Sequence, residues 1–270
     1  MKLFAFGDSW TEGQGADLSK ENSIESVEDR KIFRNERSWP KHLSELLNVN
    51  CVYKSKSGQS NNDIFKSVVD SIKSKEISND DLVIVMWSST LRDQVPFFPD
   101  GEWHSWGKKY MDNDFKKEWF IDKNLSKISD YNQFLINFKR LYIEQLYSDS
   151  YYNIINQNYI IFLQELLKHY GISYFFCDAF DMMINNLDEK DDKTKLIDQI
   201  RYWGFGEKTF KDHLIGLGEI GLFETDVPFG ITPGKHPSEL GYKLIAKEMN
   251  DFIISNNIIV PNQISKNKLI

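Results

Sequence analysis

The segment Asp81–Trp87 (DLVIVMW) is apolar at every position after Asp81. A strand with one solvated face alternates apolar and polar residues, whereas a strand covered on both faces is apolar along its whole length. Strands of the second kind are typical of parallel sheets that lie between two layers of helices. This segment therefore predicts a buried strand of an α/β protein.

Predicted strands and predicted helices alternate along the rest of the chain. Buried strands are predicted at Lys2–Phe6 (KLFAF) and Ile172–Cys177 (ISYFFC), and a further strand at Cys51–Lys54. Helices are predicted at Ser38–Leu47 with Ser38 as N-cap, around Ile64–Ile72 with Asn62 or Asp63 as cap, and at Tyr131–Leu146, Asn153–Tyr170 and Ser238–Ile254. Residues 181–230 look irregular to helical. The alternation predicts a three-layer α/β/α fold with a doubly wound, mostly parallel, flavodoxin-like sheet.

An aromatic-rich stretch over residues 91–130 interrupts this alternation. It is too long for an ordinary connection, so we expect an insertion that forms a lid or a small subdomain. Its aromatic side chains could stack on sugar rings, wall an acyl pocket, or form the insertion's own small core. We expect one α/β domain over residues 1–260 and a frayed tail over 261–270.

Composition excludes several classes of protein. The net charge of −7 and the lack of a Lys/Arg cluster argue against a nucleic-acid partner. The longest apolar run, Leu82–Trp87, is far shorter than the ~20 residues of a membrane-spanning helix. Cys51 and Cys177 form no disulfide framework or zinc motif, and we expect two buried core thiols. The acidic stretch Asp188–Asp192 lacks the spacing of a calcium loop, so no metal is expected.

The first residues, MKLFAFGDSW, contain too short an apolar stretch for a signal peptide. We therefore expect cytoplasmic synthesis without a signal peptide. The abundance of Lys, Asn and Ile fits an AT-rich bacterial or phage genome. A protein carried on a phage virion would need no signal peptide of its own. The sequence leaves the oligomeric state open.

Polar residues follow the predicted strands. They are Gly7-Asp8-Ser9, Ser57-Gly58-Gln59 and Ser88-Ser89-Thr90, with His236 just before the last predicted helix. Ligands of doubly wound sheets bind beyond the carboxyl ends of the strands, where these residues would meet.

A serine on a tight turn can act as a nucleophile if a base lies near it. His236, stiffened by Pro237 and held by the following helix, is the candidate base for Ser9. The backbone N–H groups of Ser9 and Gly58 are candidate donors to an oxyanion. The structural alternatives are a turn hydroxyl at Ser9 and a turn glycine at Gly58. For Asp8 we favour a carboxylate that stabilises the turn over a catalytic acid.

These residues resemble the conserved blocks of the GDSL/SGNH hydrolases. Gly7-Asp8-Ser9-Trp10 resembles the first block, Ser57-Gly58-Gln59-Ser60 the second, Asp81–Thr90 the third, and His236-Pro237 with Gly241 the fifth. The resemblance covers residues 2–90 and 172–255. It implies a three-layer α/β/α fold and ester hydrolysis without a cofactor, with Ser9 as nucleophile, His236 as base and Gly58 as an oxyanion donor.

The chain departs from the family's pattern at two positions. The Asn of the third block falls near Thr90, whose hydroxyl would donate from a shorter arm, with Ser89 and Arg92 as supporting residues. The Asp that usually stands three residues before the His is Pro233 here. Asp226 or Glu224 could orient His236 instead, or a backbone carbonyl could do so in a Ser–His dyad.

Three functions are compatible with these residues. The first is a serine esterase or deacylase that hydrolyses a small acyl ester, for example an O-acetyl group on a glycan. The second is a non-catalytic module on the same fold that binds a glycan or a protein through the aromatic insertion. The third is an acyltransferase that uses the same residues with a sugar as acceptor. The chemical reactivity of Ser9 distinguishes the first function from the second.

Overall fold

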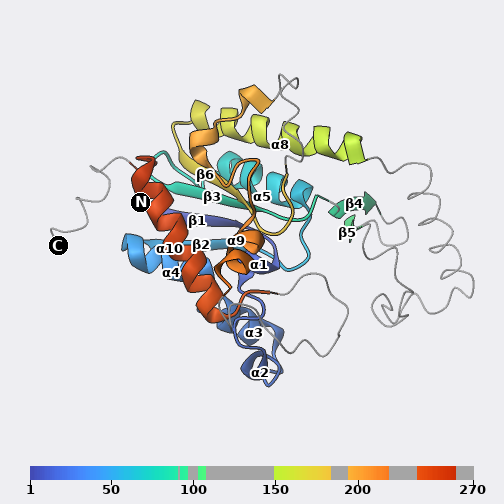
Figure 1. Cartoon of the computed structure of the whole chain (residues 1–270), viewed down its shortest axis with the longest axis vertical. Coiled ribbons are helices and arrows are strands. Elements are labelled where there is room, and N and C mark those ends of the chain that lie inside the picture. The colour runs from blue at the N-terminus through green and yellow to red at the C-terminus, as the bar shows by residue number, and fades with distance from the viewer. Residues whose placement is uncertain (91, 97–102, 108–148, 184–193, 219–235, 260–270) are drawn as a thin grey trace, which may run out of the picture.

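The structure is a computed structural model, and it describes residues 1–90, 92–96, 103–107, 149–183, 194–218 and 236–259 (Figure 1). Several expectations lie outside the described residues. These are the helix Tyr131–Leu146, most of the aromatic insertion over 91–130, the acidic stretch Asp188–Asp192 and the tail 261–270.

A five-stranded sheet forms the centre of the described chain. All of its strand pairs are parallel. Its order is β2 (Asn50–Ser55), β1 (Lys2–Gly7), β3 (Leu82–Trp87), β6 (Ser173–Asp178) and β7 (Tyr202–Trp203). The chain passes from β1 to β2 on one side and then to β3 on the other, so the order reverses between β1 and β3. Sheets of this kind bind ligands at that reversal.

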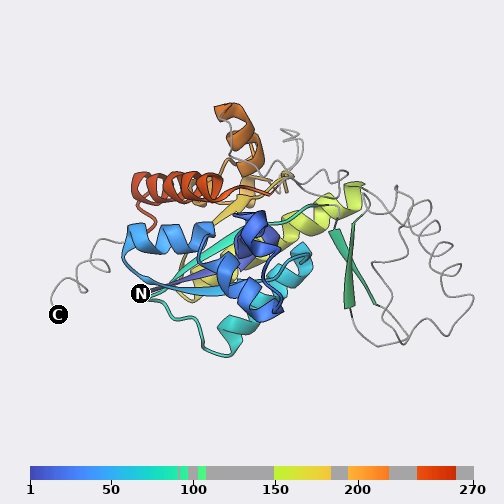
Figure 2. The same ribbon diagram turned by 90° about the horizontal axis from the view of Figure 1, so that it is seen from below.

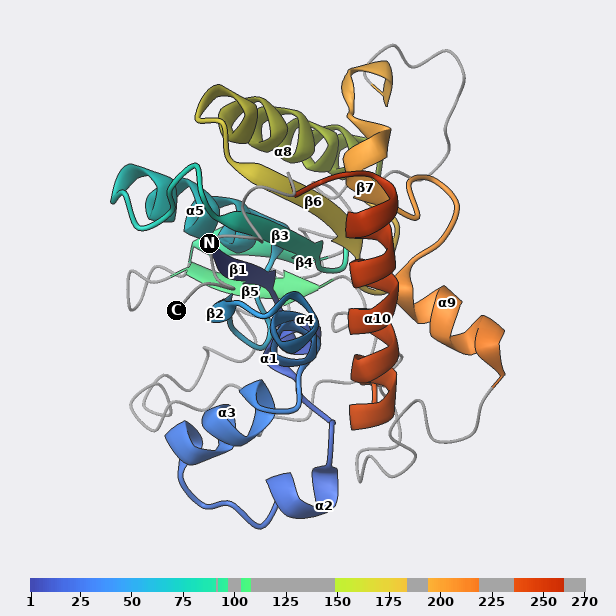
Figure 3. The same ribbon diagram turned by 90° about the vertical axis from the view of Figure 1, so that its left-hand side faces the viewer.

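Helices cover both faces of the sheet, as Figures 1 and 3 show. On one face, Leu3 and Ala5 of β1 pack with α4 (Trp39–Leu47) and α10 (Glu239–Ser255). On the other, Phe4 and Phe6 pack with α5 (Asn61–Lys73) and α8 (Asp149–His169). Successive side chains of a strand point to opposite faces, so apolar residues at every position give two cores. The predicted three-layer α/β/α fold is confirmed.

Strand β3 has every residue buried, as its unbroken apolar sequence predicts. The strands predicted near β1, β2 and β6 are also present, each within two residues at its ends. Strand β7 was not predicted. It has two residues and pairs with β6 through Phe176 and Cys177, so only tertiary contacts define it.

Of the two predicted helix N-caps, the one for α5 is wrong and the one for α4 is confirmed in position. Ser60, rather than Asn62 or Asp63, caps α5, because the Ser60 side chain accepts from Asp63 N and the Asp63 carboxylate accepts from Ser60 N. Ser38 is the N-cap residue of α4 as predicted, but its hydroxyl donates to the carbonyl of Asn35 at 2.7 Å and makes no capping hydrogen bond to the helix. In addition, α8 begins at Asp149, four residues before the predicted start.

Three helices between β1 and α4 were not predicted. They are α1 (Ser9–Glu12), α2 (Leu18–Glu21) and α3 (Val27–Asn35). No residue of α3 is buried, so its sequence carries no apolar stripe that faces a core. Figure 1 shows α2 and α3 together at one end of the molecule, away from α8.

The remaining described elements are short. β4 (Arg92–Pro96) and β5 (Trp103–Gly107) form an antiparallel pair within the aromatic insertion, and Figure 2 shows them apart from the main sheet. The 3₁₀ turns η4 (Thr194–Leu196) and η5 (Gln199–Arg201) precede β7, and α9 (Phe210–Leu217) follows it. None of the helices in the described segments is both long enough and apolar enough to cross a membrane.

The two cysteines are free thiols. Cys177 is buried in the core, as expected, whereas Cys51 on the edge strand β2 is half-buried, which corrects the expectation of two buried thiols.

Candidate active site

The turn after β1 places Ser9 at the carboxyl edge of the sheet. Gly7, the last residue of β1, allows this turn to pack closely, because a Cβ at that position would lie 2.0 Å from Oγ1 of Thr11 and 3.0 Å from the carbonyl oxygen of Met86. The predicted Gly7-Asp8-Ser9 turn is in fact the start of a helix, since Ser9 is the first residue of α1. The N–H groups of a first helical turn have no acceptor inside the helix.

Asp8 is buried and is the N-cap of α1, directly before Ser9. Its Oδ1 accepts from the backbone N–H of Trp10 at 3.0 Å, and its Oδ2 accepts from the hydroxyl of Ser88 at 2.7 Å. The side-chain oxygen of Asn61 accepts from Ser88 N at 2.8 Å. The carboxylate of Asp8 thus joins the start of α1 to the loop that follows β3.

His236 lies across the site from Ser9 and precedes α10. Ser238 caps α10 by accepting from Gly241 N. The helix is tied to the segment after α1, because Glu239 N donates to the Ala16 carbonyl at 3.0 Å and the Tyr242 hydroxyl donates to the Gln14 carbonyl at 2.8 Å.

This docking brings two predicted site residues together. His236 Nε2 lies 3.0 Å from Oγ of Ser9, across 227 residues of sequence. Ser9 is only 3% exposed, and His236 is half-buried. A ring nitrogen at this distance can accept the hydroxyl proton, which is the arrangement of a serine nucleophile and its base.

Gly58 lies in a tight turn after β2. Gln59 N donates to the Lys56 carbonyl at 3.2 Å, and Gly58 has φ of +84°. The third residue of such a turn needs this left-handed conformation, which glycine adopts without strain. Because Gly7 pairs with Ser55 in the parallel register of β1 and β2, the turn lies at the same sheet edge as Ser9.

The other predicted site residues lie in the loop after β3, in β4, or outside the described residues. Thr90 and Ser89 are buried in the loop after β3, and the Ser89 hydroxyl donates to the Asp181 carboxylate. Arg92 begins β4, but its side chain lies outside the described residues. Asp226, Glu224 and Pro233 all lie outside them as well.

Asp178, at the carboxyl end of β6, is a buried acid that the sequence analysis did not single out. Burial raises the pKa of its carboxyl to about 7, although hydrogen bonds from Tyr202 and Met183 N oppose that shift. The Tyr202 hydroxyl donates to Asp178 at 2.6 Å, and Met183 N donates at 3.2 Å. Its position at the end of an apolar strand is the signal that could have indicated it.

Two further polar residues near the site were missed. Asn61 holds Ser88, and Glu12 accepts from Ser57 N at 2.6 Å, next to Gly58. The pattern Ser60-x-x-Asp63 is a capping box, and recognising it would have placed Asn61 at the first position of α5. For Glu12, the one signal is its place three residues after Ser9 on a polar segment.

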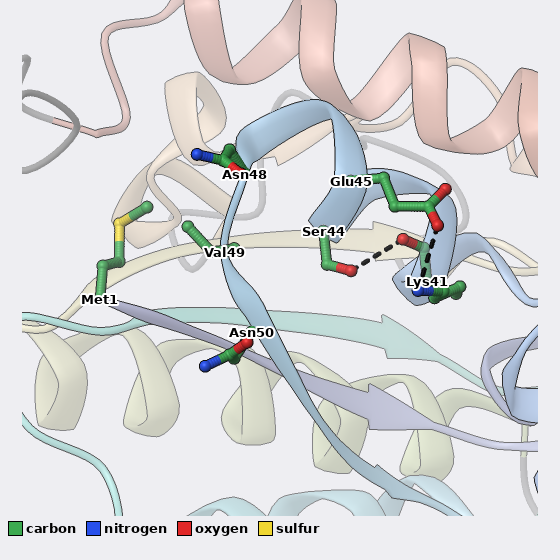
Figure 4. Close-up of a pocket in the computed structure, with 7 residues that line it drawn as sticks. All are labelled: Met1, Lys41, Ser44, Glu45, Asn48, Val49 and Asn50. Carbon is green, nitrogen blue, oxygen red and sulfur yellow. Dashed lines mark hydrogen bonds and ion pairs between the residues drawn. The ribbon is translucent and has the colours of Figure 1, made fainter. Parts of the chain in front are cut away.

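Neither of the two described surface cavities contains Ser9 or His236. One, of about 270 Å³, is shown in Figure 4 and is lined mostly by α4 and the start of β2, with Met1 and Asn50 at the amino end of the sheet. The other, of about 490 Å³, lies along α5 and includes Lys54, Lys66 and Asp70. The first is at the opposite sheet edge from Ser9.

The described part of the chain contains no cluster of three or more His, Cys, Asp or Glu side chains that could hold a metal ion.

Comparisons with known proteins give distant structural likenesses. A member of the lipolytic G-D-S-L family from Veillonella parvula DSM 2008 is 15% identical, with a TM-score of 0.41 over 94% of this chain and 97% of that one. The psychrotrophic esterase EstA from Pseudoalteromonas sp. is 10% identical, with a TM-score of 0.41 over 94% and 97%. The acetyl xylan esterase Est2A from Butyrivibrio proteoclasticus is 12% identical, with a TM-score of 0.42 over 94% of this chain and 63% of that one.

A search of curated proteins finds no match. A family model, in contrast, matches residues 20–263, a span that begins after Ser9 and includes His236. The chain therefore belongs to the family of unknown function DUF6071.

Proposed function

We propose that the chain is a divergent serine esterase of the GDSL/SGNH type, with Ser9 as nucleophile and His236 as general base. The observation that carries this proposal is the 3.0 Å distance between Oγ of Ser9 and Nε2 of His236. The substrate is a small acyl ester, such as an O-acetyl group, and the acceptor of the acyl group is water.

In the first half of the reaction, Oγ of Ser9 attacks the ester carbonyl while Nε2 of His236 takes the hydroxyl proton. The carbonyl oxygen becomes an oxyanion, which accepts from the N–H groups of Ser9 and Gly58 and from the Thr90 hydroxyl. The C–O bond to the alcohol then breaks, and His236 returns its proton to the leaving alcohol.

In the second half, water attacks the acyl group on Ser9. His236 takes a proton from this water, and the oxyanion forms again. Its collapse breaks the bond between the acyl carbon and Oγ, releases the acid, and His236 returns its proton to Oγ of Ser9. The pair needs no metal, so we expect a chelator to leave the rate unchanged. Asp8 acts as the N-cap that fixes the nucleophile's helix, and it takes no part in proton transfer.

The test is covalent labelling by a fluorophosphonate, followed by intact mass and peptide mapping. Ser9 would displace fluoride from phosphorus, so the wild type should gain one adduct on the peptide that contains Ser9. Ser9→Ala should gain none. His236→Ala should react on the order of 10² to 10⁴ times more slowly, because removal of a general base costs about that much.

Hydrolysis of p-nitrophenyl acetate, measured on the same proteins, extends the test to an ester. Ser44→Ala is a suitable control, because Ser44 is also buried but lies on α4 and bonds to the Lys41 carbonyl. A folded wild type that gains no adduct would contradict the proposal and favour a binding function on this fold.

A further inference from the structure

A chain of charged contacts, built on two buried carboxylates and the half-buried Arg34, joins α3 to the turn that contains Gly58. Its centre is Glu12 on α1, whose side chain is 6% exposed. One oxygen, Oε1, accepts from Nη1 of Arg34 at 2.7 Å, and the other, Oε2, accepts from the backbone N–H of Ser57 at 2.6 Å. Both oxygens of this carboxylate are therefore engaged, one by a guanidinium and one by the main chain.

Arg34 is itself fixed by a second buried carboxylate. Its Nε and Nη2 donate to Oε1 of Glu21 at 2.8 and 2.5 Å, and Glu21 Oε2 accepts from Gly15 N at 3.2 Å. The Arg34 side chain is 15% exposed and Glu21 4%. Although burial opposes the charge, the bonds to Glu21 and Glu12 raise the pKa of Arg34, so the guanidinium stays protonated.

Buried ion pairs add little net stability, because the loss of hydration offsets most of their attraction. Their geometry, in contrast, is well defined, since a guanidinium binds carboxylates in a fixed planar arrangement. We therefore attribute to Glu12 and Arg34 a role in fixing the position of a neighbouring segment.

The segment that Glu12 holds is the turn Lys56–Gln59. The Ser57 amide is bound by Glu12, and the Ser57 hydroxyl donates to Oε1 of Gln14 at 2.8 Å. Glu12 belongs to the helix whose first residue is Ser9. The nucleophile and the turn with the candidate oxyanion donor Gly58 are thus joined through one carboxylate.

We propose that Glu12 is a positioning residue that fixes the Gly58 amide relative to Ser9, and that Arg34 holds Glu12 in the orientation this requires. This inference rests on the proposed esterase function, and it assigns the helices α2 and α3 a role in arranging the oxyanion site. Neither side chain touches the reacting atoms. A displaced oxyanion donor costs about 10- to 100-fold in the rate of the chemical step.

Glu12→Ala removes both contacts, whereas Glu12→Gln keeps the shape and one acceptor oxygen. The rate of fluorophosphonate labelling should therefore fall in the order wild type, Glu12→Gln, Glu12→Ala. With p-nitrophenyl acetate, kcat should fall at least about 10-fold in Glu12→Ala with KM within about two-fold, because the donor acts on the oxyanion. If Glu12→Ala does not fold, Glu12→Gln and Arg34→Lys carry the test, each with a several-fold loss.

Asp81→Asn is the matched control. Asp81 is a buried carboxylate that accepts from Lys2 N at 2.7 Å and Ser78 N at 3.0 Å, at the other end of the sheet. It should label at the wild-type rate. The midpoint of the pH–rate profile should be the same in wild type and Glu12→Gln, since the base is unchanged. Hydrogen exchange of the peptide over residues 54–60 should accelerate in the Glu12 variants and not in Asp81→Asn.

Failure of this inference and failure of the proposed function give different results. If the wild type labels and both Glu12 variants label as fast as Asp81→Asn, Glu12 does not position the site. If exchange over residues 54–60 is unchanged, Glu12 does not hold the turn. If the folded wild type takes no label at all, the proposed function is wrong, and this inference is wrong with it.

Discussion

The Ser88 hydroxyl donates to Oδ2 of Asp8 at 2.7 Å, and both side chains are fully buried. This contact ties the loop after β3 to the carboxylate that caps α1. It lies where the strand order reverses, between β1 and β3. The position of Ser9 therefore depends on a hydrogen bond between the residues that directly follow β1 and β3.

Ser88→Ala should lower the free energy of unfolding by about 1–3 kcal/mol, because a buried carboxylate loses a donor. Ser78→Ala is the matched control. Its hydroxyl donates to Asp81, also at 2.7 Å, but Ser78 is exposed and water can replace the bond. The loss in free energy of unfolding for Ser78→Ala should be smaller than about 1 kcal/mol. Urea unfolding measures both, and equal losses would contradict the prediction.

Arg34→Met should lower the free energy of unfolding by about 3–5 kcal/mol, because it leaves the buried carboxylates of Glu12 and Glu21 without their cation. Lys41→Met provides the comparison. Lys41 pairs with Glu45 at 3.1 Å on the exposed side of α4, and such pairs contribute less than about 1 kcal/mol. A loss for Arg34→Met as small as that for Lys41→Met would show that the buried cluster is not coupled to folding.

Gly7→Ala should be strongly destabilising, by more than about 2 kcal/mol, because its Cβ would overlap Thr11 and the Met86 carbonyl. Thr11→Ala in the same chain should restore part of the loss by removing the nearest atom. Gly216→Ala in α9 has open space around its Cβ and should gain about 0.5–1 kcal/mol from helix propensity. Thermal unfolding of the three variants checks the opposite signs.

The stability contributed by Asp178 should depend on pH. Its folded-state pKa of about 7 lies above the ordinary value of 3.8, so the folded protein retains a proton that the unfolded chain has released. This contribution is complete below pH 4 and is lost as the pH rises to 7. The stability of the wild type relative to Asp178→Asn should fall across that range by on the order of 4 kcal/mol.

Chemical denaturation of both proteins at intervals between pH 4 and 8 measures this difference. Tyr202→Phe is a useful third protein, because it removes a hydrogen bond that favours the charged form of Asp178. In Tyr202→Phe the pKa of Asp178 should be higher still, so the fall in stability should extend to higher pH. A difference between wild type and Asp178→Asn that does not change with pH would contradict the prediction.

The sequence was sufficient where burial determines structure. The apolar runs in β1, β3 and β6 predict covered strands because solvent exposure would be costly at every position. The order of those strands determines the sheet edge at which Ser9 and His236 meet. Their 3.0 Å distance was not predictable, because it depends on how Glu239 and Tyr242 dock α10 on the segment after α1.

The sequence was insufficient where polar contacts between distant segments determine structure. Helix α3 buries no residue, and its position is fixed by Arg34, whose partners Glu12 and Glu21 lie 22 and 13 residues away. No local periodicity encodes such a contact. The position of β7 likewise depends on contacts with distant segments, because Tyr202 is held by Asp178 and by pairing with β6.

The docking of α10 on the loop after α1 joins the last described helix to the first, and it has a consequence for synthesis. During translation, Ser9 leaves the ribosome long before the residues of α10 exist. Contacts across 227 residues form late, since closing so large a loop costs entropy that earlier folding must first reduce. The growing chain therefore carries Ser9 without its base, and the pair assembles only after His236 and α10 have been synthesised.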